Sequence, residues 1–213
     1  MNILFINNYD SFVYNLVNYI CQITSDSNII VEDNNISVDK VKSLNIDKMI
    51  ISPGPGHPKY DTGTVIPIIK EFYSKFPILG VCLGHQAIVE AFGELEHPDN
   101  EIEYVGLAKV GPMHGKISKI FHDQETIFKD IQNPLMGVRY HSLAAKSDLL
   151  AQDLKISATA DDGTIMGVRH KQYSVEGLQF HPESIKMKPY GMQILKNFLE
   201  YYGELRYLKN KKY

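Results

Sequence analysis

Short apolar segments alternate with segments of helical periodicity over the first ninety residues of this chain. The apolar segments are short enough to be strands and lie at residues 3–6, 28–31, 49–51 and 78–81. Hydrophobic residues fit a helical pattern in the segments that follow them, at 11–22, 38–44, 64–74 and 83–92. Strands that alternate with helices predict a parallel sheet covered on both faces, with a ligand site at the carboxyl ends of its strands.

The second half of the chain has a different pattern. Residues 104–181 are mostly short β-like runs separated by turn signals, of which Asp161-Asp162-Gly163 is a strong hairpin signal. A further strand is expected at 174–181 and a final helix at 190–202. The predicted fold class is therefore α/β, with an open, largely parallel central sheet flanked by helices and extra antiparallel strands in the second half.

The domain organisation predicted from this pattern is simple. No linker, repeat or low-complexity segment interrupts the chain, so we expect one domain over residues 1–202. The remaining residues, 203–213, are rich in lysine and arginine and predict a frayed, solvated tail.

Composition makes several functional classes improbable. The net charge of −3 gives no field that favours nucleic acid or an anionic membrane. No segment approaches the ~18 apolar residues of a membrane span. The two cysteines, Cys21 and Cys82, form no disulfide framework, which indicates a reducing, cytoplasmic compartment. Cys21 lies late in the first predicted helix, and we expect it in the core or near it.

Cys82 is the predicted nucleophile. It lies where an apolar strand ends and a helix begins, with Gly80 and Gly84 two residues to either side, as in the nucleophile elbow G-x-S-x-G with cysteine in place of serine. Such a sharp turn leaves no room for a side chain at the glycine positions. The N-terminus of the following helix favours a thiolate. Without these neighbours, a free cysteine is more often a small buried residue.

His181 is the predicted base. A thiolate that displaces an amine needs a group that returns a proton to the leaving nitrogen. Of the eight histidines, His181 alone is expected to end a buried strand with a carboxylate, Glu183, two residues on. Pro182 stiffens the link, so that Glu183 can orient the imidazole. His-Pro-Glu on its own also fits a capped turn. No pair of cysteines or histidines has the spacing of zinc ligands, so no metal is expected.

A loop rich in proline and glycine follows the third predicted strand. Its sequence, Ser-Pro-Gly-Pro-Gly-His-Pro at residues 52–58, makes it rigid yet leaves backbone amides accessible to a ligand. On its own the loop is equally compatible with an ordinary turn. Its expected position, at the same sheet edge as the elbow, makes it a candidate for substrate contacts.

These motifs together resemble the class I glutamine amidotransferases. The segments that carry this resemblance are 52–56, 80–86 and 179–184. Four more segments are similar to the glutaminase subunits of anthranilate synthase and aminodeoxychorismate synthase, namely 8–16, 113–116, 139–143 and 166–171. The resemblance runs from residue 1 to about residue 202. One departure lies just after the third motif, where Lys186 and Lys188 replace the small or acidic residues that are common in the family.

The resemblance implies a catalytic triad of Cys82, His181 and Glu183. Cys82 is expected to attack the side-chain amide of glutamine and form a γ-glutamyl thioester. His181 is expected to protonate the departing ammonia and then activate water. The backbone amides of the predicted oxyanion hole belong to Gly54 and Leu83. The residues expected to bind glutamine are Gly56, Gln86, Ser142 and Leu143.

The resemblance also implies a partner, a chorismate-binding synthase subunit that takes up the ammonia in a hetero-oligomer. No cofactor is expected in this subunit, and Mg²⁺ is expected in the partner. The candidate contacts are loops at the rim of the active site, 57–62 and 185–190. A free-standing γ-glutamyl thiol hydrolase and a catalytically silent regulatory module stay open as alternatives. The sequence does not distinguish a role in tryptophan synthesis from one in folate synthesis.

Overall fold

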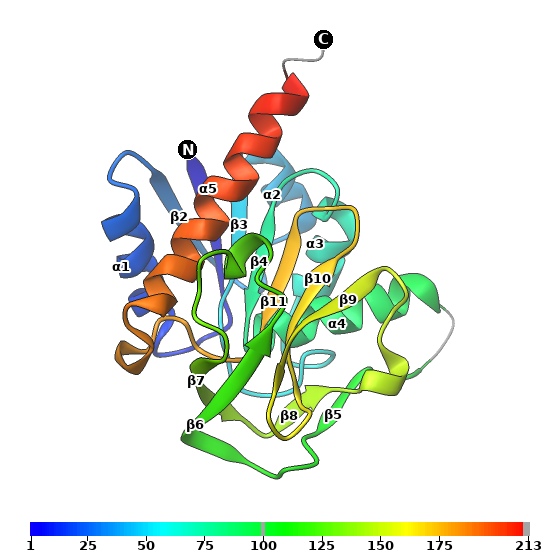
Figure 1. Ribbon diagram of the computed structural model, residues 1–213. Helices are drawn as coiled ribbons and strands as arrows, with labels where there is room; N and C mark the ends of the chain where they lie inside the picture. Colours follow the sequence, from blue (N-terminus) through cyan, green and yellow to red (C-terminus); the bar gives the residue numbers. More distant parts are fainter. Residues whose placement is uncertain (99–100, 211–213) are drawn as a thin grey trace.

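A nine-stranded mixed sheet forms the centre of the computed structural model, which describes residues 1–98 and 101–210 (Figure 1). The strands of this sheet are β1 (Asn2–Asn7), β2 (Asn28–Asp33), β3 (Lys48–Ile51), β4 (Ile78–Val81), β6 (Met113–His122), β7 (Leu135–His141), β9 (Leu154–Ala160), β10 (Ile165–His170) and β11 (Val175–Leu178). A separate two-stranded sheet is formed by β5 (Val105–Leu107) and β8 (Leu143–Ala145). The α-helices are α1 (Val13–Ile23), α2 (Val38–Ser43), α3 (Val65–Phe72), α4 (Leu83–Glu96) and α5 (Tyr190–Asn210), and the 3₁₀ helices are η1 (Thr126–Phe128), η2 (Ser147–Leu149) and η3 (Ile185–Met187).

The sheet has a parallel half and an antiparallel half. Strands β2-β1-β3-β4-β11 are parallel to one another, whereas β11-β10-β9-β6-β7 are antiparallel. The predicted fold class is therefore confirmed, including the extra antiparallel strands. The hairpin predicted at 161–163 is confirmed as well, because it joins β9 to β10. Gly163 has φ +82° there, and its N–H donates to the Ala160 carbonyl at 3.0 Å.

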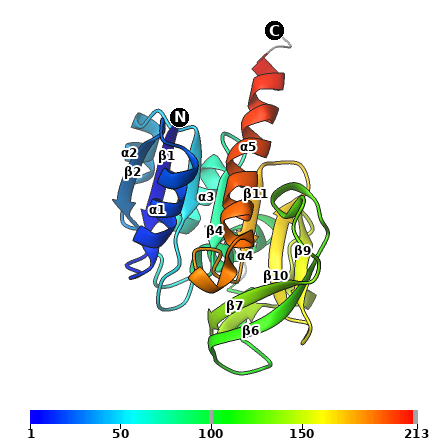
Figure 2. The same ribbon diagram turned by 60° about the vertical axis from the view of Figure 1, so that its left-hand side comes forward.

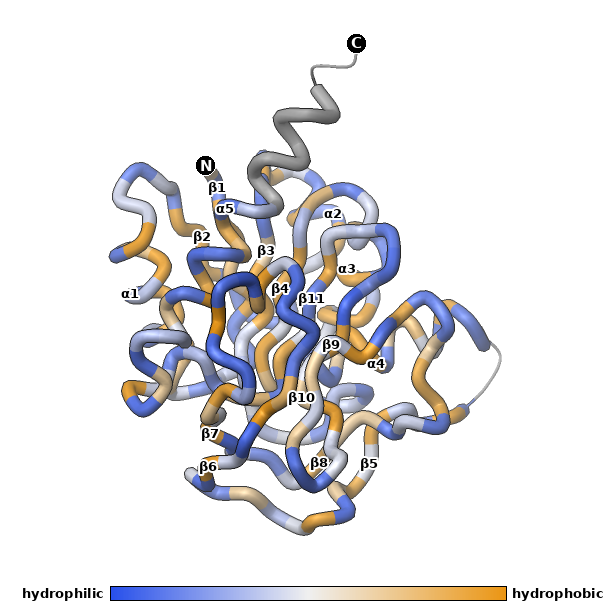
Figure 3. Tube along the Cα trace, in the orientation of Figure 1, coloured by the Kyte–Doolittle hydropathy of each residue, from blue (hydrophilic) through white to orange (hydrophobic). Residues whose placement is uncertain are grey.

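Successive residues of the parallel strands face two different hydrophobic cores. On β1, Ile3 and Phe5 pack in the core that holds α1 and α5, whereas Leu4 and Ile6 pack in the core that holds α2, α3 and α4. Figure 2 shows α1 and α5 on one side of the sheet and α3 and α4 on the other. Burial on both faces explains why these segments are continuously apolar, as the orange stretches along the central strands show in Figure 3.

Two predictions about positions are wrong. Cys21 is exposed rather than in or near the core, because the buried face of α1 is formed by Val13, Leu16, Tyr19 and Ile20. A residue next to Ile20 is rotated by about 100° around the helix and leaves that face. The strand expected at 174–181 ends at Leu178, so His181 lies in the loop beyond β11.

The final helix is longer than the sequence analysis predicts. It continues to Asn210 instead of ending at residue 202, so most of the expected tail is helical in its backbone. Residues 204–210 include several good helix formers, and Gly203 costs the helix only about 1 kcal/mol. Residues 211–213 of the predicted tail lie outside the described part of the chain. No helix within 1–98 and 101–210, α5 included, is long and apolar enough to cross a membrane.

The carboxyl ends of four parallel strands meet at one edge of the sheet. After β1 and β3 the chain continues into Asn8 and Ser52, and the Asn8 amide donates to the Ser52 carbonyl at 2.9 Å. After β4 the chain reaches Cys82, whose N–H donates to the carbonyl of Leu178 at the end of β11. The residues predicted to carry the chemistry therefore follow neighbouring strands.

Two glycines make the turn at Cys82 possible. A Cβ on Gly80 would lie 2.4 Å from the Gly84 carbonyl oxygen, and a Cβ on Gly84 would lie 2.4 Å from the Ile51 carbonyl oxygen. Both obstacles are backbone atoms in a packed region, which cannot move aside cheaply. The close approach of β3, β4 and α4 therefore requires glycine at both positions.

We expect Gly80→Ala to lower the free energy of unfolding by about 2 kcal/mol, because the new methyl group collides with backbone. Gly106→Ala is the matched control, since its Cβ would approach only the flexible Lys146 side chain, with Cε at 2.7 Å. Urea unfolding of the two variants measures the difference. Equal losses in the two proteins would contradict this account of the elbow.

Candidate active site

Cys82 occupies a strained position between β4 and α4. Its φ of +52° lies in the left-handed region, which non-glycine residues adopt at a cost and which occurs often at functional sites. The Leu178 carbonyl accepts its N–H at 2.7 Å, and its own carbonyl accepts the Gln86 N–H at 3.0 Å. The side chain is 6% exposed. Cys82 is the N-cap residue of α4, so its side chain lies at the positive end of the helix dipole.

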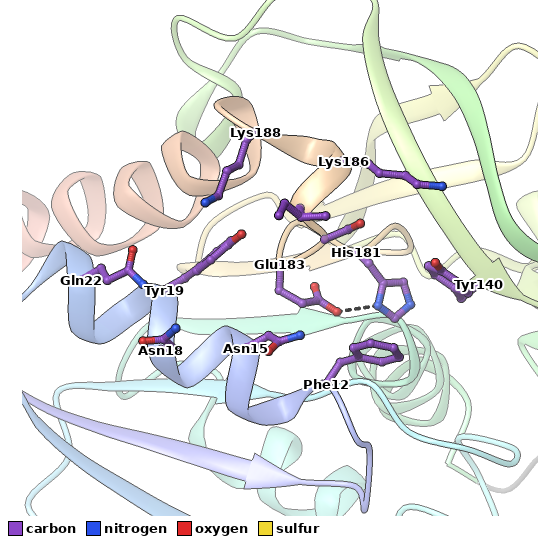
Figure 4. Close-up of a pocket in the computed structure, with 12 residues that line it drawn as sticks. Phe12, Asn15, Asn18, Tyr19, Gln22, Tyr140, His181, Glu183, Lys186 and Lys188 are labelled. Atoms are coloured by element: carbon purple, nitrogen blue, oxygen red, sulfur yellow. Dashed lines mark hydrogen bonds and ion pairs between the residues drawn. The ribbon is translucent and has the colours of Figure 1, made fainter.

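His181 and Glu183 form a buried hydrogen-bonded pair, with 2.6 Å between Nδ1 and Oε1 (Figure 4). Burial lowers the pKa of His181, but the adjacent Cys82 side chain and the Glu183 carboxylate outweigh burial and hold that pKa well above its usual value. Glu183 is bonded to Nδ1, whereas Nε2 is buried and has no hydrogen-bond partner within the described residues, so it is available to the adjacent Cys82 side chain. The arrangement favours the protonated form of His181.

The residues predicted for the oxyanion hole lie together. A Cβ on Gly54 would be 2.8 Å from Cδ2 of Leu83, so the loop after β3 touches the first residue of α4. The N–H of Leu83 belongs to the first turn of the helix and has no partner within it. Gly56 has φ +90°, and a Cβ there would lie 2.4 Å from a carboxylate oxygen of Asp61. Only glycine fits this second position.

Gln86 and Leu143, two of the predicted glutamine-binding residues, contact each other. The Gln86 Nε2 group donates to the Leu143 carbonyl at 3.1 Å and to Oε1 of Gln179 at 2.9 Å. Both amide hydrogens are thereby used, and Oε1 takes part in neither bond. Ser142 has an exposed side chain, and its carbonyl accepts the N–H of Ala108 at 2.8 Å.

The comparison with known proteins assigns this chain to a family. The model of the class-I glutamine amidotransferases matches residues 4–201. The chain belongs to this family. The resemblance seen in its motifs is thus confirmed, and the protein is an enzyme of the glutamine amidotransferase type.

Individual relatives extend over the same region. The chain is 50% identical over 206 residues to an anthranilate synthase component 2 of Methanocaldococcus jannaschii, which covers 93% of this chain and 96% of the relative. It is 42% identical over 200 residues to an aminodeoxychorismate/anthranilate synthase component 2 of Bacillus subtilis, with 94% and 96% covered. It also matches a multifunctional tryptophan biosynthesis protein of Phycomyces blakesleeanus at 44% identity over 203 residues, 95% of this chain, but spans only 25% of that protein.

A solved structure supports the fold. The crystal structure of a candidate GMP synthase protein from Thermoplasma acidophilum superposes with a TM-score of 0.81 and covers 99% of this chain and 98% of that one. Its sequence identity is 23%, so the likeness shows the fold alone.

Two residues that the sequence analysis did not single out touch the sulfur of this amidotransferase. The Gln179 Nε2 group donates to Cys82 Sγ at 3.7 Å. The Tyr140 carbonyl accepts from Cys82 Sγ at 3.8 Å. The Tyr140 ring also packs edge-on against His181, with 5.3 Å between ring centroids. Both residues stand in family-like segments. Their contacts depend on how the strands align, which the sequence alone does not give.

A half-open cavity of about 470 Å³ borders the His181–Glu183 pair (Figure 4). One wall comes from α1 and the residue before it, with Phe12, Asn15, Asn18, Tyr19 and Gln22. The opposite wall comes from the segment after the triad, with Ser184, Ile185, Lys186 and Lys188. Cys82 is not part of the lining. The amidotransferase therefore has open space beside His181 and Glu183, bounded by the lysines that depart from the family pattern.

His141 fixes the Leu143 carbonyl from the other side. Its Nε2 accepts from Arg139 Nε at 3.0 Å, so Nδ1 carries the proton that is donated to the Leu143 carbonyl at 2.8 Å. Burial, above all, lowers the pKa of His141 to about 4, and the nearby Arg139 and His181 add to the effect. His141 is therefore neutral at pH 7 and acts as a fixed hydrogen-bond donor.

Replacing Glu183 by glutamine keeps an acceptor for Nδ1 but removes the negative charge that helps to raise the pKa of His181. We expect the His181 resonance in an NMR pH titration to move to lower pH, with His181→Gln used to assign it. Glutamine hydrolysis should fall on the order of 10³-fold, because a neutral amide no longer stabilises the imidazolium. An unchanged titration midpoint would show that Glu183 does not set the protonation of His181.

Proposed function

We propose that this chain is the glutamine-hydrolysing subunit of a chorismate-using synthase and releases ammonia through a thioester on Cys82. The observation that carries the proposal is the position of Cys82, which has a positive φ of +52° at the start of α4 and lies beside the buried His181 imidazole. This imidazole is hydrogen-bonded to Glu183 at 2.6 Å. Nucleophile, acid–base group and orienting carboxylate are the parts that acyl transfer requires.

In the first half-reaction, the Cys82 thiolate attacks the side-chain amide carbon of glutamine. Negative charge develops on the amide oxygen, where the backbone N–H groups of Gly54 and Leu83 act as donors. The carbon–nitrogen bond then breaks, and His181 gives its Nε2 proton to the leaving nitrogen. The products are ammonia and a γ-glutamyl thioester, with His181 left neutral.

In the second half-reaction, neutral His181 takes a proton from water. The resulting hydroxide attacks the thioester carbonyl, and the carbon–sulfur bond breaks. Glutamate leaves, and the pair of thiolate and imidazolium is restored. Glu183 keeps the imidazole aimed at the sulfur throughout.

Glutamine is held by Gly56, Gln86, Ser142 and Leu143 in this proposal. Gln86 offers Oε1 as an acceptor, because both of its amide hydrogens are engaged. The Leu143 carbonyl already accepts from Gln86 and His141. A substrate contact from Leu143 therefore uses its N–H or its side chain.

The partner in this proposal is a synthase subunit that uses chorismate. It is supported by relatives named component 2 of anthranilate synthase, and by one whose name includes both anthranilate and aminodeoxychorismate. The rim loops 57–62 and 185–190 are the proposed contact. Each loop exposes a large side chain, Tyr60 at 65% and Ile185 at 75%. The thioester route uses side chains of this chain alone, and we place the Mg²⁺ in the synthase.

Reconstitution with chorismate, Mg²⁺ and each candidate synthase subunit tests the proposal. With glutamine as donor, we expect one synthase to form anthranilate or aminodeoxychorismate, and Cys82→Ser to abolish the product. With ammonium as donor, the same Cys82→Ser complex should keep its synthesis, because the thiol serves only the release of ammonia.

Cys21→Ser is the control for this experiment, since Cys21 is an exposed thiol on α1. It should leave both activities unchanged. Glutamine-dependent synthesis that survives Cys82→Ser would overturn the proposed chemistry. No product with either synthase, while each still works with ammonium, would overturn the proposed partner.

A further inference from the structure

A row of buried side-chain amides connects the nucleophile to the glutamine-binding residues. Gln179 Nε2 donates to Cys82 Sγ at 3.7 Å, and Gln179 Oε1 accepts from Gln86 Nε2 at 2.9 Å. Gln86 Nε2 also donates to the Leu143 carbonyl at 3.1 Å. Gln179 is fully buried and Gln86 is 3% exposed, so water does not compete freely for these bonds.

The Leu143 carbonyl fixes the orientation of both side-chain amides in this row. A backbone carbonyl can only accept, so Gln86 must point its NH₂ group at Leu143. The same NH₂ group reaches Gln179, which must therefore present its oxygen to Gln86 and its own NH₂ to the sulfur. A flipped Gln179 would set two NH₂ groups against each other at 2.9 Å. The geometry thus makes Gln179 a donor toward Cys82.

The pairing of β4 with β11 places Gln179 beside the nucleophile. Val81 is in register with Leu178, and both strands are parallel. The residues that directly follow these two strands are Cys82 and Gln179, so the two side chains start side by side. The Gln179 N–H donates to the Met166 carbonyl of β10 at 2.9 Å, which anchors Gln179 at the end of β11.

We propose that Gln179 is a further catalytic residue, whose Nε2–H group donates to the Cys82 sulfur and stabilises it as a thiolate. This inference rests on the proposed function. The Tyr140 carbonyl also faces the sulfur, at 3.8 Å, and can accept from a thiol but repels a thiolate. Gln179 supplies a neutral donor that offsets this repulsion. It acts when the thiolate attacks and again when the thiolate leaves the thioester.

The rate of Cys82 alkylation by iodoacetamide at pH 7 tests the inference. The background is Cys21→Ser, which leaves Cys82 as the one thiol of the chain. Gln179→Met introduces an apolar side chain of similar length and removes the Nε2–H donor. We expect it to be alkylated about tenfold more slowly, the size of one hydrogen bond to a charged group.

Gln179→Glu distinguishes the loss of the hydrogen-bond donor from a change in packing, because it preserves the size and shape of the side chain. Its carboxyl group still accepts from Gln86, so a purely structural role predicts an unchanged alkylation rate. We expect a loss at least as large as that of Gln179→Met, because a carboxylate repels the thiolate and a carboxylic acid gives it a proton. The control is Gln172→Glu, the same change at an exposed position, which should be alkylated at the normal rate.

The outcome is independent of the partner, because alkylation needs no synthase and no chorismate. Thermal unfolding shows which variants fold, and if Gln179→Glu does not, Gln179→Met decides. Unchanged alkylation in a folded Gln179→Met or Gln179→Glu variant would overturn the role of Gln179 and leave the proposed function intact. Slower alkylation in the Gln179 variants, together with failure of every reconstitution, would support the role of Gln179 and overturn the proposed function.

Discussion

The sharp turn at Cys82 is the constraint on which the rest of this molecule depends. A cysteine holds a left-handed φ of +52° there because Gly80 and Gly84 let β3, β4 and α4 approach to backbone contact. Strain of this kind persists only where the surroundings determine the backbone. Here the parallel pairing of β4 with β11 does so, and it also brings in the segment that carries Gln179, His181 and Glu183. The packing at this turn thereby brings Cys82 together with the residues that surround it.

Burial lowers the pKa of both histidines near this turn, but their neighbours shift the two pKa values in opposite directions. His181 has a carboxylate at 2.6 Å and the Cys82 side chain beside it, so its pKa is raised despite burial. His141 has the Arg139 guanidinium on one nitrogen and a carbonyl on the other, so its pKa falls to about 4. His181 is therefore protonated more readily than a free imidazole, whereas His141 is a neutral donor to the Leu143 carbonyl.

Local motifs made much of the fold and site predictable from the sequence. The elbow needs only five consecutive residues, and His181 and Glu183 are two apart, so their chemistry shows without an alignment. Long-range contacts were not predictable. Gln179 and Tyr140 meet Cys82 through strand register, which the sequence does not encode in any short motif. The exposure of Cys21 depends on which face of α1 the sheet covers. The length of α5 depends on how little Gly203 destabilises the helix.

The most direct test of the thioester is to trap it. The subunit, docked on its synthase, is mixed with glutamine labelled in its carbon chain, quenched with acid within one turnover, and digested. The account predicts label on the peptide that contains Cys82, released by hydroxylamine at neutral pH as expected for a thioester. Label on the Cys21 peptide, or none on any peptide during active turnover, would contradict a covalent intermediate on Cys82.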